Sequence, residues 1–574
     1  MGYGNLRQWI EQLRKDKDLA VIDTPVDPHL ELAEIHRRVV QNEGPALLFT
    51  QVKGTPFPVA TNLFGTVRRV EKAFGPRPEQ LMKSLMNACE NLHPPTLSGL
   101  WKEKSMLIDL LKVGTKNVSQ GEAPVLGICR NRDSLKELPR ITTWQVDAGP
   151  FVELPIVYTE SINRSKEHSL GMYRVQIQDD NTANLFWNTR RTGGGFHHHE
   201  AKLSGEALPV SLFIGGPPAL MATAIAPVPE RVPELLFASM MLGGRLPLVK
   251  DPMGGHRIPA EAEFAIRGLV PPNEEDYSVM HIQRMWHRKD AIYPVSLLSK
   301  PRQEDHYLGN FLQRLLSPAY PLVMPSVRSL WTYSETGSQT LASAVVHVSY
   351  SQETLAAAFR ILGEGQLSRT RFLLLTNEPV ELSDFPKLLE TVLERFNPAG
   401  DLLIFNQTSY DEVNDKGTKL NPGSKGIMIG VGSPIRDLPR AYDEGVIPGI
   451  HDVQPYCGGC LAASGASYEE DPTLPQRLVA ALRDRGTSWP LVILVDNAAE
   501  TVKTQASFLG SVFTHFNPAT DIYAESEVVN HHVGYKLPIV IDARMKQRNS
   551  EEILPNEDIV ERVNQNWKNY FPTA

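Results

Sequence analysis

Cysteine is scarce in this sequence, with four in 574 residues, so a disulfide framework is excluded as the basis of the fold. No apolar run approaches the roughly 20 residues that cross a bilayer, and no membrane insertion is expected. The amino terminus lacks the apolar core of a secretory signal, which predicts a cytoplasmic protein. The formal net charge of -8 argues against nucleic-acid binding, which needs a concentrated basic face.

The chain contains regions with two different patterns of predicted secondary structure. With 41% apolar and 22% charged residues it is an ordinary folded protein, and it is too long for one core. Helices and strands alternate over residues 1–115, which is an α/β pattern. Short strands between turn residues fill 116–304 and predict a barrel or closed sheet. Alternation of helix and strand returns over 305–545, and an amphipathic helix follows within 546–574.

The third region carries an internal duplication. Residues 371–405 match a segment 120 positions later without a gap, so that Asn377 falls on Asn497 and Asp401 on Asp521. Each copy contains an apolar strand, a helix and an Asn-Pro turn that ends the helix and starts the next strand. Two copies predict a duplicated βαβ unit within one sheet, since two are too few for a solenoid.

Residues 190–199, RRTGGGFHHH, form the most unusual stretch. The glycines would let the backbone approach a phosphate, and Arg190 and Arg191 would supply forked donors to its oxygens. A glycine-rich hairpin turn with solvated histidines is the simpler interpretation of the same spacing. A histidine tract alone is weak evidence for a metal site.

Carboxylates and thiols give further candidates. Glu234 begins a helix after two prolines, where it can bind a hard cation or simply stabilise the helix amino terminus. Glu274 and Glu275 are adjacent and could share a proton as a general acid requires, although an acidic turn in water has the same composition. Cys457 and Cys460 have the spacing of a redox pair, but their loop-like flanks favour a structural role.

Taken in chain order, several segments resemble the UbiD family of prenylated-flavin-dependent decarboxylases. They are TPVDPHLELAEI, GPALLF, NLFGTVRRV, HSLGMYRVQ, IPAEAEFAIRG, HRKDAIYP and GYKLPIVIDARMK. The resemblance implies an N-terminal α/β domain over 1–115, a split β-barrel that binds prenylated FMN over 116–304, and a C-terminal α/β domain over 305–545. The helix within 546–574 would contact another subunit. Similar long members act on a hydroxynaphthoate in menaquinone synthesis, which places the expected reaction in quinone biosynthesis.

The resemblance also implies roles for individual residues. Arg174 falls on the active-site arginine, which would face the flavin across a water-poor cavity and hold the substrate carboxylate. Glu234, Ser169 and His198 are the expected ligands of a manganese ion, with potassium as the other candidate, and Ser169 stands where the family has asparagine. The expected flavin contacts are Met172, Tyr173, Arg174, Phe186, Trp187, Asn188, Arg191 and Thr192.

One departure from the family concerns the acid. The family's acidic loop, Glu-Gly-Pro-Phe-Gly-Glu or -Asp, is absent between the strands AEFAIRG and SVMHI, where this chain has only LVPPNEEDY. In the family that loop supplies one carboxylate that pairs with the arginine and another that donates a proton. Glu274 and Glu275 are therefore the expected acids of this chain.

The resemblance predicts the reversible, non-oxidative decarboxylation of an aromatic or α,β-unsaturated acid, most simply a hydroxyaromatic one. The protein would be a homodimer or higher homo-oligomer, supplied with prenylated FMN by a UbiX-type flavin prenyltransferase. One alternative is a flavin-binding scaffold, or a subunit of a hetero-oligomeric carboxylase, without chemistry of its own. Another is a flavin or metal oxidoreductase that uses Cys457 and Cys460.

Overall fold

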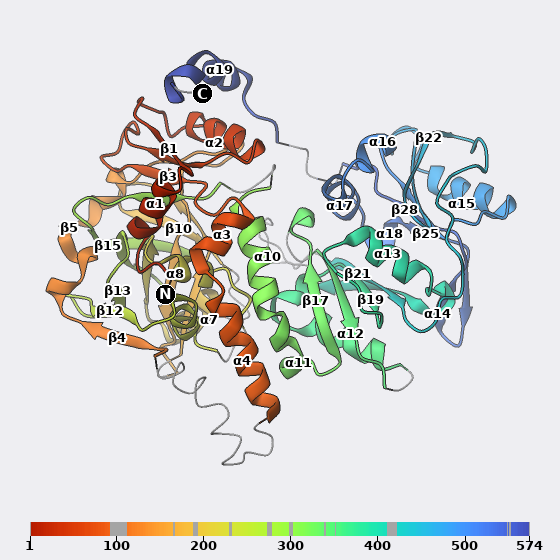
Figure 1. Ribbon diagram of the computed structural model, residues 1–574, viewed down its shortest axis with the longest axis horizontal. Helices are drawn as coiled ribbons and strands as arrows, with labels where there is room; N and C mark the ends of the chain where they lie inside the picture. The colour runs from red at the N-terminus through yellow and green to blue at the C-terminus, as the bar shows by residue number, and fades with distance from the viewer. Residues whose placement is uncertain are drawn as a thin grey trace. The chain divides into compact units, whose positions relative to one another are not determined.

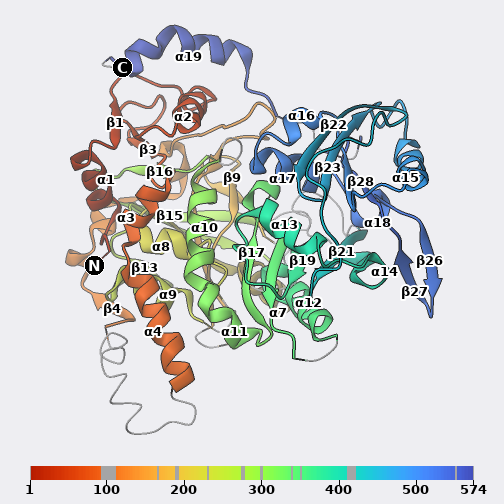
Figure 2. The same ribbon diagram turned by 45° about the vertical axis from the view of Figure 1, so that its right-hand side comes forward.

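The contacts within the chain divide it into two compact units, Met1–Leu315 with Ile553–Ala574, and Leu316–Glu552. Figure 1 and Figure 2 show their elements in two views. Within the described residues, no helix is long and apolar enough to cross a membrane. The computed structural model describes residues 2–91, 112–164, 167–187, 193–228, 232–272, 278–297, 302–337, 340–349, 352–409, 422–547, 549 and 553–572.

The first unit begins with an amphipathic helix, α1 (Leu6–Lys15), whose apolar side chains are buried. Asn5 caps it by accepting a hydrogen bond from the backbone N–H of Gln8. A four-stranded sheet follows in the order β1-β2-β3-β16, and its first two strands run parallel because a helix crosses over between them. The elements are β1 (Leu19–Ile22), α2 (Glu31–Gln41), β2 (Ala46–Phe49), β3 (Val59–Thr61) and β16 (Tyr293–Val295).

An antiparallel sheet of nine strands occupies the centre of the first unit, in the order β6-β9-β10-β15-β14-β11-β7-β8 with β5 paired to β15. The end strands β6 and β8 do not pair with each other in the described part of the chain, so hydrogen bonding does not close the expected barrel. One apolar core stabilises the sheet and includes Val175, Leu212 and Phe264. The strands are β5 (Ile128–Arg130), β6 (Phe151–Val152), β7 (Ile156–Glu160), β8 (His168–Met172), β9 (Arg174–Ile177), β10 (Thr182–Phe186), β11 (Leu208–Ile214), β14 (Phe264–Val270) and β15 (Ser278–His287).

Helices and a small sheet complete the first unit. The expected boundary at residue 304 falls at the start of α10, which belongs mostly to this unit because Phe311 stacks on Phe74 at 4.8 Å. The helices are α3 (Val67–Phe74), α4 (Arg77–Asn91), α7 (Gly193–Ser204), α8 (Pro218–Thr223), α9 (Glu234–Leu242) and α10 (Glu304–Leu316). The strands of the small sheet are β4 (Thr115–Val118), β12 (Leu246–Lys250) and β13 (Arg257–Pro259).

The closing helix, α19 (Glu557–Tyr570), packs on α2 of the same chain. The Tyr570 hydroxyl donates to the Glu31 carboxylate at 2.6 Å, and Arg38 donates to the Val560 carbonyl at 2.8 Å. Part of the apolar face of α19 is therefore covered within one chain. A contact of this helix with another subunit stays a prediction.

The second unit contains two five-stranded sheets with corresponding strand orders, β17-β18-β19-β21-β20 and β22-β23-β24-β28-β25. In each sheet three central parallel strands lie between two antiparallel edge strands. The first sheet contains β17 (Val327–Thr332), β18 (Leu341–Val346), β19 (Phe372–Thr376), β20 (Leu402–Ser409) and β21 (Pro422–Gly430). The second contains β22 (Ile450–Cys457), β23 (Cys460–Gly465), β24 (Leu491–Leu494), β25 (Ile522–Tyr523) and β28 (Ile539–Asp542).

The duplication expected from the sequence is present in this unit as pairs of matched helices. The backbone N–H of Asn397 donates to Asp401 at 2.8 Å, and that of Asn517 donates to Asp521 at 2.6 Å, so both Asn-Pro turns are closed in the same way. The matched helices, each pair offset by 120 residues, are α13 (Phe385–Leu393) with α17 (Gln505–Phe513), and α14 (Pro398–Asp401) with α18 (Pro518–Asp521).

The two copies lie in two separate sheets and not in one sheet as expected, because each copy pairs with its own edge strands, but they share one apolar core. Phe372 of the first copy contacts Phe513 and Phe516 of the second, with ring centroids 6.0 and 5.6 Å apart. The remaining elements of the unit are α11 (Tyr320–Val323), α12 (Glu353–Gly363), α15 (Leu474–Asp484), α16 (Ala498–Thr501), β26 (Ser526–Val529) and β27 (His532–Tyr535).

Candidate active site around Arg174

Arg174 is the first residue of β9, which lies between β6 and β10. Its guanidinium carbon is 4.1 Å from the centre of the Phe151 ring, and its Nη2 donates to the Asp147 carboxylate at 3.1 Å. The side chain is nevertheless 55% exposed. The expected water-poor cavity is therefore not formed by the described residues, because one ring and one carboxylate are the contacts that hold the guanidinium. Its exposure leaves it accessible to a ligand.

Two carboxyl groups that no sequence motif marks lie beside Arg174. Asp147 is the ion-pair partner, with its side chain only 9% exposed. Val152 pairs with Val175 in the antiparallel register, so the next residue, Glu153, comes opposite Arg174. Burial raises the pKa of Glu153 to about 8, against the opposing effect of the Arg174 charge. The sequence pointed to acids in another loop, and a two-residue strand such as β6 gives no pattern that predicts this pairing.

An aromatic pair, Tyr173 and Trp187, lies against the amino end of α7. The two rings meet edge to face with centroids 5.9 Å apart. A Cβ at Gly193 would lie 2.6 Å from the Tyr173 hydroxyl, and one at Gly194 would lie 2.8 Å from the Trp187 ring. Gly193 also has a φ of +73°, which glycine adopts without strain. The glycine run was expected to form a hairpin turn. It opens a helix instead, where the backbone passes too close to two rings for any other residue.

The consecutive histidines lie on α7 and point in different directions, because neighbours on a helix are turned by about 100°. His197 Nδ1 lies 2.8 Å from the Thr159 hydroxyl of β7. His198 Nδ1 lies 3.0 Å from the Ser278 hydroxyl of β15, and its Nε2 lies 3.5 Å from the Pro271 carbonyl. Both ring nitrogens of His198 thus contact protein groups, and these contacts do not support the expected role as a metal ligand.

Glu234 is the first residue of α9, as the sequence predicts. Its Oε2 lies 3.7 Å from His168 Nε2, and burial raises the pKa of the carboxyl. Ser169 points to the opposite face of β8 from His168, because side chains alternate along a strand. The expected ligands Glu234, Ser169 and His198 are therefore not brought together. The described part of the chain contains no group of three or more His, Cys, Asp or Glu residues that could hold a metal.

The remaining expected contacts lie at or beyond the ends of described segments. Phe186 pairs with Arg174 in the register of β10 and β9, and Met172 ends β8. The Trp187 indole donates to the Ser278 hydroxyl at 2.6 Å, which ties the end of β10 to the start of β15. The residues outside the described ranges are Asn188, Arg191, Thr192, Glu274 and Glu275.

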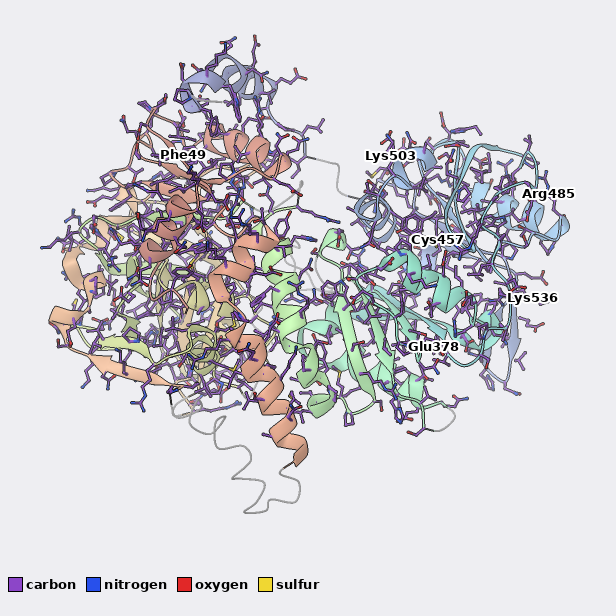
Figure 3. The ribbon with its side chains drawn as sticks, in the orientation of Figure 1. Phe49, Glu378, Cys457, Arg485, Lys503 and Lys536 are labelled. Carbon is purple, nitrogen blue, oxygen red and sulfur yellow. The ribbon has the colours of Figure 1, made fainter. Side chains whose placement is uncertain are left out.

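The pair Cys457 and Cys460 lies in the second unit, where the two residues face each other across a turn of two glycines (Cys457 is labelled in Figure 3). Cys460 is buried, and burial raises the pKa of its thiol well above the usual value. A buried protonated thiol is a poor nucleophile. This environment supports the structural interpretation of the pair.

Family models match all three expected regions of the chain. The 3-octaprenyl-4-hydroxybenzoate carboxy-lyase N-terminal domain matches residues 10–89, the Rift-related domain matches 116–301, and the C-terminal domain matches 306–430. The last match ends at Gly430, the final residue of β21, so the second copy of the duplication lies beyond the family model.

Relatives match over the whole length. A protein of Chlamydia pneumoniae, named as a subunit of 4-hydroxybenzoate decarboxylase, is 42% identical, covering 99% of this chain and 98% of its own. An uncharacterized protein of Chlamydia caviae is also 42% identical, covering 100% of both chains.

Solved structures support the same fold. The UbiD-class enzyme HmfF from Pelotomaculum thermopropionicum, in complex with FMN, has a TM-score of 0.59 at 22% identity, covering 78% of this chain and 98% of its own. Vanillic acid decarboxylase of Sedimentibacter hydroxybenzoicus in its closed form has a TM-score of 0.65 at 19% identity, covering 78% and 96%. With three family domains matched in order and full-length relatives at 42% identity, the chain belongs to the UbiD family.

Proposed function

We propose that this protein catalyses the reversible, non-oxidative decarboxylation of an aromatic or α,β-unsaturated acid, with a hydroxyaromatic acid as the first candidate. The observations that carry the proposal are the accessible guanidinium of Arg174 and the glycine and aromatic cradle formed by Tyr173, Trp187, Gly193 and Gly194, which begins at the preceding residue of the chain. The relative named for 4-hydroxybenzoate decarboxylase supports the same class of substrate. A role in quinone biosynthesis is part of this proposal.

The residues fit a flavin cofactor. The amino end of α7 has no side chain at Gly193 or Gly194, so a phosphate could approach the backbone there, where it would replace the Tyr173 hydroxyl that accepts from the Gly194 N–H at 3.3 Å. The residues that would hold the flavin are Met172, Tyr173, Arg174, Phe186, Trp187, Asn188, Arg191 and Thr192. Bound prenylated FMN would supply the electron sink that no side chain offers. The HmfF structures in complex with FMN and with prFMN support this choice of cofactor.

The chain's own residues would position the substrate acid and stabilise its negative charge. Arg174 would hold the substrate carboxylate through two parallel hydrogen bonds, a geometry that suits the planar guanidinium. The Phe151 ring beneath it restricts where the guanidinium can move. Once carbon dioxide leaves, an acid must deliver a proton to the substrate carbon.

A manganese ion, or potassium in its place, is expected from the family resemblance. The described residues bring Glu234 and His168 within 3.7 Å, while Ser169 and His198 point elsewhere. One carboxylate and one imidazole form a poor site for a hard cation, which takes six or more oxygen ligands. No step of the reaction is therefore assigned to a metal.

The second candidate function is a flavin-binding scaffold or a subunit of a hetero-oligomeric carboxylase. The word subunit in the relative's name and the absence of the family's acidic loop favour it. It shares the cofactor with the first candidate but predicts no turnover by the isolated chain. A redox function for Cys457 and Cys460 is not proposed, because Cys460 is buried.

The test is production of the full chain together with a UbiX-type flavin prenyltransferase, with the cofactor's absorption spectrum recorded after purification. Carbon dioxide release is then screened over hydroxybenzoates, naphthoates and cinnamates. Flavin binding with release from at least one acid supports the enzyme. Flavin binding without release from any acid supports the scaffold. We also propose a cytoplasmic homo-oligomer, which light scattering of the purified protein tests.

A further inference from the structure

The segment from 147 to 153 surrounds Arg174 with two carboxyl groups, and an inference about them rests on the proposed decarboxylation. Asp147 Oδ2 accepts hydrogen bonds from the backbone N–H groups of Thr143 at 3.2 Å and Trp144 at 2.8 Å. Its other oxygen, Oδ1, accepts from Arg174 at 3.1 Å. The backbone hydrogen bonds thus hold the Asp147 carboxylate in position, and the carboxylate in turn orients the Arg174 guanidinium.

Glu153 follows β6 in the chain and has a different environment from Asp147. The β6–β9 register brings it opposite the arginine, and it is partly buried. The groups that act on its charge are Arg174, Asp147 and the buried Tyr293 of β16. Because burial raises its pKa to about 8, the carboxyl is mostly protonated at neutral pH. A protonated acid and a fixed carboxylate therefore both lie close to the Arg174 guanidinium.

The position of the acid matters because the proton goes to the carbon from which carbon dioxide departs. That carbon is bonded to the carboxylate that Arg174 would hold, so the acid must lie next to Arg174, within hydrogen-bond reach of the reacting carbon. Glu274 and Glu275 lie outside the described residues, in the connection between β14 and β15. Glu153 is the carboxyl whose position beside Arg174 follows from strand pairing.

We infer that Glu153, rather than Glu274 or Glu275, is the acid that protonates the substrate carbon, and that Asp147 orients Arg174. The bond between the carboxylate carbon and the substrate carbon breaks, and its electron pair stays with the substrate. Carbon dioxide leaves, and the proton on the Glu153 oxygen moves to that carbon. The Glu153 carboxylate then regains a proton from water. In sum, one carboxylate and one proton become one carbon dioxide and one C–H bond.

The activity test uses the full chain loaded with cofactor. Glu153→Gln keeps the shape of the side chain but removes the acid, and it should lower kcat by about 100-fold or more while the flavin spectrum is retained. Asp147→Asn should raise KM by about tenfold with a smaller effect on kcat, because it loosens Arg174. The control for Asp147 is Asp180→Asn, which breaks the exposed pair of Asp180 with Arg140 and should leave both constants unchanged.

The matched control for Glu153 is Glu304, a second buried carboxyl of the same unit, whose pKa is raised to about 7 mainly by burial. Its Oε1 accepts from the Phe64 N–H at 2.8 Å. Both folded pKa values lie above the usual carboxyl value of about 4.3, so the unfolded chain releases these protons first and stability falls as pH rises from about 4 to 8. In unloaded protein, Glu153→Gln and Glu304→Gln should each flatten this fall. Only Glu153→Gln should lose turnover.

Each outcome decides the assignment. Full turnover by Glu153→Gln overturns it, as does an unchanged pH dependence of unfolding in the unloaded variant. Loss of turnover in Glu274→Gln with Glu275→Gln, and not in Glu153→Gln, assigns the acid to the other loop. If circular dichroism shows that Glu153→Gln does not fold, Glu153→Asp replaces it. An unchanged kcat in Glu153→Asp would also overturn the assignment. A wild-type chain that binds the flavin but releases no carbon dioxide overturns the decarboxylase function itself, and this assignment with it.

Discussion

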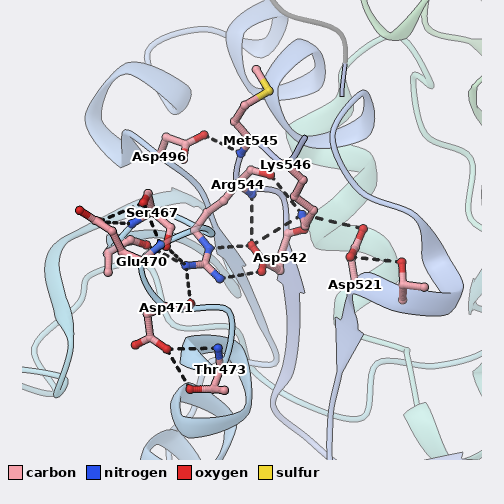
Figure 4. A network of polar contacts seen from close by, with 12 residues as sticks. Ser467, Glu470, Asp471, Thr473, Asp496, Asp521, Asp542, Arg544, Met545 and Lys546 are labelled. Atoms are coloured by element: carbon pink, nitrogen blue, oxygen red, sulfur yellow. Dashed lines mark hydrogen bonds and ion pairs between the residues drawn. The ribbon is translucent and has the colours of Figure 1, made fainter. Parts of the chain in front are cut away.

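Two arginines of this chain show how differently the same side chain is used. In the second unit, Arg544 is fully buried and forms a two-pronged ion pair with Asp542 at 2.9 and 2.8 Å (Figure 4). Its Nη1 also donates to the carbonyls of Ala466, Ser467 and Asp471. In the first unit, Arg174 is 55% exposed and makes one ion pair.

The difference separates a structural site from a binding site. Arg544 ties together loops that follow the carboxyl ends of β23 and β28, an edge where α/β sheets often bind ligands. Its three nitrogens all donate to protein oxygens, so it has little left to offer a ligand. Arg174 is held on one side by Phe151 and Asp147 and remains accessible on the other. A charged side chain alone does not indicate a binding site. Hydrogen-bond donors that the described residues leave accessible to a ligand do.

The largest expected effect comes from breaking the buried pair. Arg544→Met leaves the buried Asp542 with only the more distant Lys546 at 3.9 Å, and it should lower the free energy of unfolding by about 3 kcal/mol. Arg174→Met should change it by no more than about 0.5 kcal/mol, as is usual for exposed positions. Urea unfolding followed by circular dichroism measures both. Equal losses in the two variants would show that Arg174 is also a structural arginine.

The next effect is on turnover. Arg174→Lys keeps the charge but loses the planar fork, and it should lower kcat/KM for the acid that the screen identifies by about 100-fold, or about 2.7 kcal/mol. Arg140→Lys is the matched control, because Arg140 is also a partly exposed arginine paired with one aspartate. Steady-state carbon dioxide release measures the ratio. An active Arg174→Lys enzyme would exclude two-pronged binding of the carboxylate.

The third effect tests the cradle formed by Tyr173, Trp187, Gly193 and Gly194. Gly193→Ala places a Cβ 2.6 Å from the Tyr173 hydroxyl in a backbone of positive φ. Gly205 has a similar φ of +69° but open space around it, so Gly205→Ala carries only the backbone cost of about 1–2 kcal/mol. Gly193→Ala should lose about 1 kcal/mol more. It should also weaken flavin binding, which a fluorescence titration of the unloaded protein measures. Equal flavin affinity in both variants would place the cofactor elsewhere.

Sequence patterns correctly predicted the turns and helix starts that depend on neighbouring residues in the chain. The turns at Asn397 and Asn517 were predictable because asparagine followed by proline stops a helix wherever it occurs. The start of α9 at Glu234 was predictable because Pro233 can precede a helix but not continue it. The family of the chain followed from the order of such segments, and the matching models confirm it.

Sequence patterns could not predict the contacts that depend on the pairing of strands distant in the sequence. Glu153 meets Arg174 only because β6 pairs with β9, and a strand of two residues has no periodicity to detect. The glycines of α7 have poor helix propensity and therefore predicted a turn, but packing against Tyr173 and Trp187 outweighs that propensity. The acid and the cradle were thus missed for the same reason: neighbours distant in sequence determine both.

The smallest expected effect concerns the cysteines, which belong with Arg544 on the structural side of the comparison. Cys460 is buried in the core shared by the two copies, so Cys460→Ala should cost about 1 kcal/mol of stability, and Cys457→Ser less. Neither should change carbon dioxide release more than twofold, because a protonated buried thiol has no part in the proposed chemistry. Assays with and without dithiothreitol measure this. A tenfold loss of activity, or dependence on the reductant, would make the pair catalytic after all.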